Sequence, residues 1–142
     1  MIGQRGWEAE HAHALLDRSE LLRRHVRELN DCGDAEMARY IAGAKALLMP
    51  SFAEGFGLPV VEALQLGTPV IASDLPVFRE IAGDIPLYLD PTDGAGWEQA
   101  IVGFLGRSTE RDRQLAAMRG FRAPDWPGHF AAVEPWLEAL QR

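Results

Sequence analysis

The amino-acid sequence predicts an α/β fold in which helices flank an open sheet of parallel strands, followed by a helical C-terminal tail. Three compact apolar runs, at 46–49, 69–72 and 86–89, lack the polar alternation of a half-exposed strand and are expected to be buried strands. Helical patterns at 59–67 and 76–82 lie between them, each with a proline where the first turn of a helix tolerates it. Strands that alternate with helices are joined by right-handed crossovers, so this order predicts a parallel sheet.

A helix, a short strand and a second helix are expected ahead of these strands. Apolar residues at three- and four-residue steps predict a helix over 7–24 with one buried face. The run 25–29 is expected to be the short strand, and Asp34 can cap the helix that follows. The residues expected to point inward are Ala12, Leu15, Leu16, Leu22 and Val26 before this cap and Ala38, Ile41 and Ala42 after it.

The chain after Asp90 is predicted to be helical, because apolar residues such as Ile101 and Leu115 recur at helical steps. Pro135 interrupts the last of these patterns, and since proline kinks a helix or starts a new one, that boundary stays open. The aromatic residues that follow helical spacing, and are therefore expected in the core, are Trp97, Phe121, Phe130 and Trp136.

Length and composition are those of one globular domain, with 142 residues of which 47% are hydrophobic and 25% charged. We expect a single domain over 1–142, with an α/β part at 1–92 and the helical tail at 93–142. The formal net charge of −7 has the wrong sign for gripping phosphate backbones, which argues against a nucleic-acid partner. A lone Cys32 and four scattered histidines offer neither a disulfide nor a structural zinc site.

The sequence shows no signal for a membrane or for secretion. No apolar run approaches the roughly 18–20 residues that a membrane span needs. The first residues, 1–6, lack the apolar core of a secretion signal. We therefore expect a cytoplasmic protein.

The loop after the first strand carries residues typical of a ligand site. Ligands of open α/β sheets bind at the carboxyl ends of the strands, and here Glu54, Gly55 and Gly57 come just before a helix. Backbone amides at a helix N-terminus bind anions, and glycines let a ligand approach the chain closely. The loop therefore predicts a site for a phosphate-bearing ligand.

Two carboxylates flank these amides. Glu54 lies in the loop and Glu62 is expected on the first turn of the helix after Pro59, so both can project toward one cleft. Because carboxylates repel phosphates, their better use is to accept hydrogen bonds from neutral hydroxyls. A diphosphate between two polyhydroxylated ends would suit both features, and a nucleotide sugar is such a ligand.

The segment 46–91 resembles the donor-binding lobe of the retaining GT-B glycosyltransferases of family four, the group 1 glycosyl transferases. It carries the Glu-x(7)-Glu pattern within Pro-Ser-x-x-Glu-Gly-Phe-Gly-Leu-Pro-x-x-Glu-Ala, followed by Gly-Thr-Pro-Val-Ile-Ala-Ser at 67–73. A weaker similarity extends from Gly3 to Trp126. The resemblance implies a Rossmann-like C-terminal GT-B lobe that lacks its first strand.

The resemblance also implies roles for the loop. In such enzymes the carboxylate that matches Glu54 holds hydroxyls of the donor sugar, and the one that matches Glu62 holds the ribose. Amides that match Phe56, Gly57 and Leu58 bind sugar or phosphate oxygens. Glu54 is the expected catalytic residue, orienting the sugar and stabilising positive charge at its ring. The expected donor-binding set is Glu54, Gly55, Phe56, Gly57, Leu58 and Glu62.

The implied enzyme is a retaining hexosyltransferase that uses a nucleoside-diphosphate sugar as donor substrate, with no cofactor and no metal. Its acceptor, a glycan, a lipid-linked sugar or a small molecule, stays open. So does a peripheral position at the inner face of the membrane in the intact enzyme.

Members of this family carry two further parts, namely an N-terminal lobe that binds the acceptor and a first strand and loop whose Arg and Lys hold the diphosphate. Neither has a counterpart in the 142 residues. We therefore expect the chain to be a fragment that is inactive alone. Because a missing strand leaves backbone groups unpaired, we also expect self-association or a need for the missing segment.

One other class of function stays open beside the transferase, a noncatalytic nucleotide-sugar or carbohydrate binding module or a truncated regulatory remnant. A dinucleotide oxidoreductase would need Gly-x-Gly-x-x-Gly, and no third glycine follows Gly55 and Gly57. No P-loop motif occurs either. A glycan phosphorylase or sugar epimerase of similar architecture is a weaker alternative, because the donor loops of those enzymes do not share this run of residues.

Overall fold

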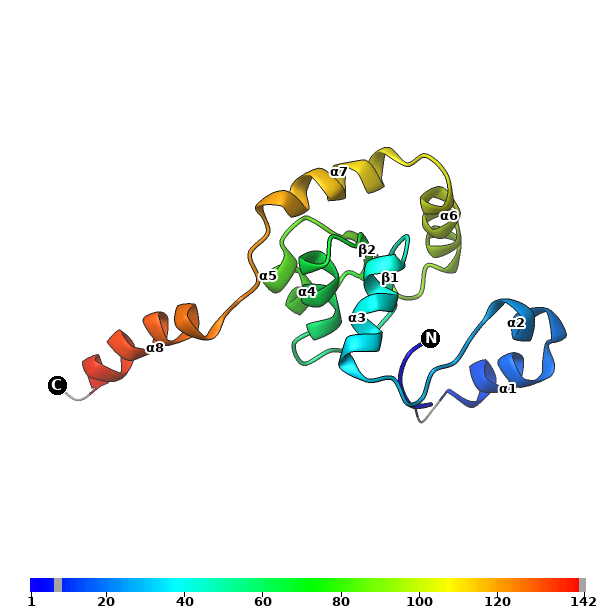
Figure 1. Ribbon diagram of the computed structural model, residues 1–142, viewed down its shortest axis with the longest axis horizontal. Coiled ribbons are helices and arrows are strands. Elements are labelled where there is room, and N and C mark those ends of the chain that lie inside the picture. Colours follow the sequence, from blue (N-terminus) through cyan, green and yellow to red (C-terminus); the bar gives the residue numbers. More distant parts are fainter. Residues whose placement is uncertain (7–8, 141–142) are drawn as a thin grey trace. The chain divides into compact units, whose positions relative to one another are not determined.

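A computed structural model describes residues 1–6 and 9–140 and has the predicted α/β fold, built on a three-stranded parallel sheet (Figure 1). By its contacts the chain divides into two units, Met1–Tyr40 and Ile41–Arg142. The first unit is helical and the second contains the whole sheet. The loop with the sequence motif lies in the second unit.

The first unit holds α1 (Glu10–Arg18) and α2 (Glu20–His25), and α3 (Asp34–Gly43) begins in it. The prediction of one helix over 7–24 is wrong, because Ser19 adopts an extended conformation and ends α1. Its hydroxyl accepts the N–H of Leu22 at 3.2 Å and so caps α2. The beginning of the predicted helix, Trp7, lies outside the described residues.

The short strand predicted over 25–29 does not form. Leu29 makes a single parallel bridge with Ile2, in which the N–H of Gly3 donates to the carbonyl of Leu29 at 3.0 Å. The N–H of Leu29 donates in turn to the carbonyl of Met1 at 2.9 Å. Among the described residues, only Leu29 of the predicted strand is therefore paired. His25, the first residue of the predicted strand, is the last residue of α2.

The apolar face predicted for the first helical segment is not buried. Neither α1 nor α2 has a buried residue. The predicted inward residues that are half-buried are Leu16, Leu22 and Val26, and those that are exposed are Ala12 and Leu15. In α3, Ile41 is buried as predicted, Ala38 is half-buried, and Ala42 is exposed. The prediction is therefore wrong for Ala42.

The second unit is built on three parallel strands in the order β1, β2 and β3. Their register pairs Leu47 with Val70 and Ile71 with Leu87. The structure confirms the three predicted strands to within a residue, but only β2 is buried along its whole length. The strands are β1 (Leu47–Met49), β2 (Val70–Ser73) and β3 (Leu87–Leu89).

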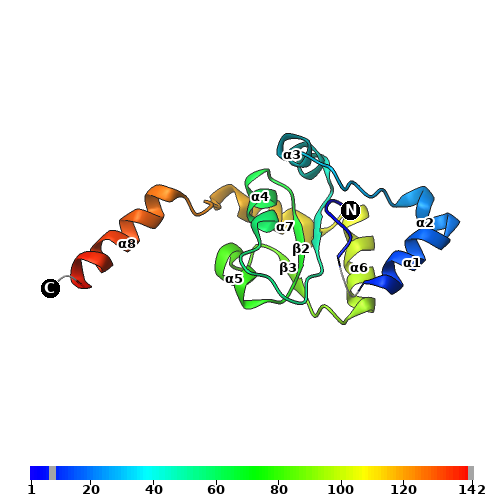
Figure 2. The same cartoon turned by 90° about the horizontal axis from the view of Figure 1, so that it is seen from below.

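Helices cover both faces of this sheet, with α4 (Leu58–Gln65) and α5 (Pro76–Ala82) on one face and α6 (Gly94–Leu105) on the other (Figure 1, Figure 2). Ile71 packs against Trp97 and Phe104 of α6. Since side chains alternate along a strand, Val70 and Ala72 face α4 and α5. The predicted helices between the strands are confirmed, with the bounds of α5 as predicted.

The predicted helical tail, 93–142, begins with α6 and continues with α7 (Thr109–Ala117), a 3-10 turn (Met118–Gly120) and α8 (Trp126–Leu140). Pro135 lies inside α8, which continues through it as one helix. Trp97 is buried and Phe121 half-buried, but Phe130 and Trp136 are 51% and 61% exposed. The prediction that the last two lie in the core is wrong, because helical spacing alone does not say whether anything covers a helix face.

The buried side chain of Gln114 fastens α7 to the sheet. Its Oε1 accepts the N–H of Val70 at 2.8 Å, and its Nε2 donates to the carbonyl of Val70 at 3.1 Å. Pairing of β2 with β3 starts one residue later, at Ile71. The amide of Gln114 therefore takes the place of a neighbouring strand at the start of β2.

Replacement of Gln114 by Leu is expected to lower the free energy of unfolding by about 1–3 kcal/mol, because the buried backbone of Val70 loses its partner. Urea denaturation followed by circular dichroism measures this change. Gln99→Leu, on the exposed side of α6, is the matched control and should change stability by less than about 0.5 kcal/mol. Equal stabilities of the two variants would contradict the role given to Gln114.

Candidate functional site

The candidate site follows β1, at the carboxyl end of the sheet. Residues 50–57 connect β1 to α4; Gly57 is the N-cap of this helix and Leu58 its first residue. Glu62 is the fifth residue of α4 and so lies in its second turn. The prediction of a first-turn position is wrong, because the left-handed conformation of Gly57 lets the helix begin one residue before Pro59.

The N-terminus of α4 leaves backbone amides free. Its cap Gly57 has no side chain, and the second helical residue, Pro59, has no N–H. Among residues 1–6 and 9–140, the N–H groups of Phe56, Gly57 and Leu58 make no hydrogen bond. Amides in this position, with the positive end of the helix dipole behind them, can donate hydrogen bonds to an anionic or strongly polar group.

The turn at Gly57 depends on the absence of a side chain. Its φ of 87° lies in the left-handed region that favours glycine. A Cβ at this position would lie 2.6 Å from Cε1 of Phe78, a fully buried residue of α5. A Cβ on Gly55 would meet no described atom within 4 Å. Gly57 is therefore required by packing beneath the turn, whereas Gly55 borders open space.

Glu54 is exposed in the loop and is oriented by Ser51, whose hydroxyl donates to its Oε1 at 2.8 Å. A carboxylate has further lone pairs, so Glu54 can also accept a hydrogen bond from a ligand hydroxyl. Phe52, Phe56 and Leu58 expose 72%, 46% and 60% of their surface along the same loop. The loop thus offers amides, a carboxylate and apolar surface to a ligand.

The helix beneath the turn, α5, is held by Tyr88 of β3. The Tyr88 hydroxyl lies 3.0 Å from the carbonyl of Phe78 and 2.8 Å from that of Gly83, and it can donate to either. The Arg79 guanidinium lies 4.5 Å from the centre of the Tyr88 ring and pairs with Asp74 at 2.6 Å. Burial raises the pKa of Tyr88 to about 12, while Arg79 lowers the pKa of Asp74.

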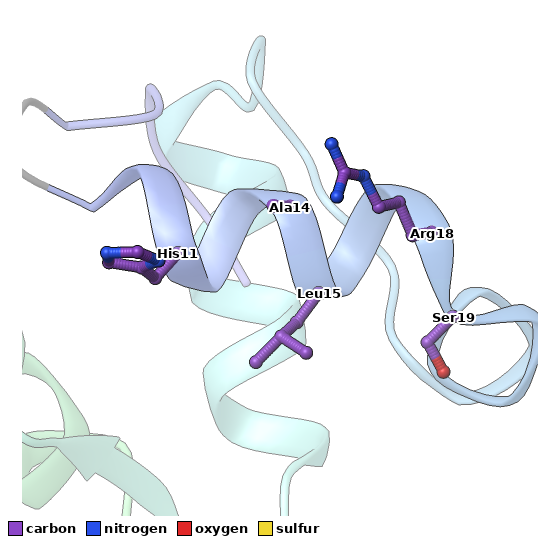
Figure 3. A pocket seen from close by; sticks show the side chains of 5 residues that line it. All are labelled: His11, Ala14, Leu15, Arg18 and Ser19. Carbon is purple, nitrogen blue, oxygen red and sulfur yellow. The ribbon is translucent and has the colours of Figure 1, made fainter.

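A pocket on α1 lies away from this loop in the sequence (Figure 3). Its lining side chains come from one helix and the residue that follows it, and the hydroxyl of Ser19 is already used as the cap of α2. It contains no part of the sequence motif, so we assign no function to it. The lining residues are His11, Ala14, Leu15, Arg18 and Ser19.

Two properties of the described residues bear on the site. Within residues 1–6 and 9–140, no three His, Cys, Asp or Glu side chains lie close enough together to hold a metal ion. No helix in the described part of the chain combines the length and apolar character needed to cross a membrane.

The open parallel sheet, with unbonded amides and a carboxylate after the end of β1, has the arrangement of an α/β domain in which ligand sites lie at the carboxyl edge. The family model described as "Glycosyl transferases group 1" matches residues 1–114. The chain belongs to this family of glycosyltransferases.

Relatives of the chain include bacterial mannosyltransferases. It is 35% identical over 122 residues to O-antigen chain mannosyltransferase B of Escherichia coli, which covers 84% of this chain and 31% of that protein. It is 35% identical over 106 residues to the phosphatidyl-myo-inositol mannosyltransferase of Mycobacterium leprae, with 72% and 28% covered. To O-antigen chain mannosyltransferase RfbU of Salmonella typhimurium it is 41% identical over 80 residues, with 56% and 23% covered. The chain thus spans less than a third of the length of these relatives.

Sequence reasoning missed two residues that shape the loop, Ser51 and Phe78. Ser51 stands three residues before Glu54, a spacing that lets a hydroxyl reach a carboxylate across a short turn. Phe78 follows Pro76, which starts α5 soon after β2 and brings its first turn beside the loop. Its contact with Gly57 had no signal in the local pattern.

The free energy of unfolding is expected to fall as the pH rises from about 10 to about 12. The Tyr88 pKa is about 12 in the folded protein and ordinarily about 10, so in this window the unfolded chain has lost a proton that the folded chain keeps. Below this window both states keep the proton and Tyr88 adds no pH dependence. Tyr88→Phe should remove this part of the loss in urea unfolding curves at about pH 9 and about pH 11. The same decline in wild type and variant would contradict the assignment.

Proposed function

We propose that the chain binds a nucleoside-diphosphate sugar at residues 51–62 and, within a glycosyltransferase, presents the sugar for transfer with retention of its anomeric configuration. The observation that carries this proposal is the set of three free amides at Phe56, Gly57 and Leu58, with the carboxylate of Glu54 in the same loop. Membership of the group 1 family supports the transferase reaction.

The amides and the carboxylates are proposed to bind different parts of the donor. The amides donate hydrogen bonds to oxygens of the diphosphate or the sugar, and they stabilise the negative charge that grows on the leaving diphosphate. Glu54 accepts hydrogen bonds from sugar hydroxyls and stabilises positive charge at the ring. Glu62, in the second turn of α4, accepts hydrogen bonds from the ribose.

In the proposed reaction, the anomeric carbon exchanges its bond to the β-phosphate oxygen for a bond to the acceptor oxygen on the same face. The acceptor proton leaves with the diphosphate, so charge and atoms balance. The mannosyltransferase names of the relatives favour mannose as the sugar, and the O-antigen chain named in two of them favours a glycan as the acceptor.

The chain is expected to bind GDP-mannose in the presence of EDTA, because amides and not a metal receive the diphosphate. Isothermal titration calorimetry with GDP-mannose, UDP-glucose and free mannose tests the donor class. A requirement for a divalent ion would contradict the proposal. In a transfer reaction catalysed by an intact glycosyltransferase that contains this segment, NMR of the product should show the anomer of the donor. An inverted product would exclude retention.

Substitution of the two carboxylates is expected to separate the two ends of the donor. Glu62→Gln should weaken binding of GDP about ten- to a hundredfold, since a charge-assisted hydrogen bond contributes about 1.5–3 kcal/mol. Glu54→Gln should leave GDP affinity unchanged and weaken the preference for GDP-mannose over GDP. Glu98→Gln, an exposed residue of α6, is the matched control. Equal losses of GDP affinity at Glu54 and Glu62 would contradict these roles.

A further inference from the structure

We propose that Phe78 of α5 is a positioning residue for the donor-binding amides, holding the turn at Gly57 in place from beneath. This inference rests on the proposed function of the loop. Phe78 itself does not contact the donor, because its side chain is completely buried. Its packing against Gly57 fixes the orientation of the Phe56, Gly57 and Leu58 amides at the start of α4.

The contact between Phe78 and Gly57 leaves no room for movement toward α5. An ideal Cβ on Gly57 would lie 2.6 Å from Cε1 and 2.9 Å from Cδ1 of the Phe78 ring, and 3.3 Å from Cδ1 of Ile81. These distances are shorter than ordinary van der Waals contact. The ring therefore lies directly against the backbone of the turn.

Gly57 is the single place where this part of the loop is buried. From Phe52 to Leu58, every other residue is exposed, including the large side chains of Phe52, Phe56 and Leu58. The exposed side chains cannot fasten the loop to the domain. The turn is therefore held by α4, four of whose residues are buried, and by the contact of the Gly57 backbone with the ring beneath it.

The ring itself is held in a fixed frame. The N–H of Phe78 donates to the carbonyl of Leu75 at 3.0 Å, and the Tyr88 hydroxyl lies 3.0 Å from its carbonyl. The neighbouring Arg79 pairs with Asp74 at the end of β2. Contacts with β2 and β3 thus hold α5, and the Phe78 ring of α5 supports the turn that carries the amides. Such support matters because small displacements of binding groups weaken ligand binding.

The experiment compares Phe78→Leu with Phe104→Leu, the same substitution in the core formed by α6, which covers the opposite face of the sheet (Figure 2). Both variants should lose stability in urea. In ¹⁵N NMR experiments, the residual dipolar couplings of the N–H bonds of residues 55–58, which report bond orientation and not the ring current of Phe78, should change in Phe78→Leu and stay the same in Phe104→Leu. The affinity for GDP-mannose should fall about tenfold or more in the first variant and less than about twofold in the second.

A second pair of variants tests the contact itself. Gly57→Ala should weaken GDP-mannose binding because the new Cβ meets the Phe78 ring. Phe78→Leu makes space for this Cβ. In the double variant, the fold-loss of GDP-mannose affinity should therefore be smaller than the product of the two single fold-losses. It should not vanish, because alanine at a positive φ stays strained.

Three outcomes would overturn the inference. One is equal N–H dipolar couplings and equal affinities in Phe78→Leu and Phe104→Leu, which would make Phe78 an ordinary core residue. Another is multiplicative losses in the double variant. If the amides move in Phe78→Leu but the wild-type chain binds no nucleotide sugar, the proposed function fails, and the role of Phe78 toward a donor fails with it.

Discussion

The burial of β2 is the constraint on which the sheet unit depends. All four of its residues are buried, with β1 and β3 paired to its two edges and helices on its two faces. The side chain of Gln114 completes its hydrogen bonding where β3 has not yet begun. Because β2 has neighbours on both edges and both faces, it fixes the position of each element that packs against it. The neighbouring strands and helices are short, so their positions depend on these contacts.

Two connections to β2 determine the geometry of the site. One runs through β1, which is in register with β2 and ends where the loop begins. The other runs through α5, which follows β2 directly and places an aromatic ring beneath the loop. The loop is therefore attached to the domain through β1, through α4 and through the contact of Gly57 with Phe78. Its polar groups face the solvent.

Much of the sheet unit could be predicted from the sequence, because compact apolar runs and well-placed prolines are local signals. β1, β2 and β3 and the whole of α5 follow from them. The family of the chain could be predicted as well, since the spacing of Glu54 and Glu62 around the glycines is itself a sequence pattern. The roles of those residues toward a donor stay predictions.

The parts that the sequence did not predict depend on tertiary contacts or on a competition between local structures. Ser19 fits a helical pattern by position, but its hydroxyl stabilises a helix start instead and so divides the segment. Phe130 and Trp136 have the spacing of core residues but remain more than half exposed in the described part of the chain. The burial of Gly57 against Phe78 joins residues far apart along the chain, and no local pattern reports such a contact.

The core of the sheet unit closes at Met118, the last buried residue in the described part of the chain. The helix beyond it, α8, contributes none of its side chains to that core. Substitutions in α8 are therefore uncoupled from the packing of the sheet. They leave β2, and with it the position of the loop at 50–57, unchanged.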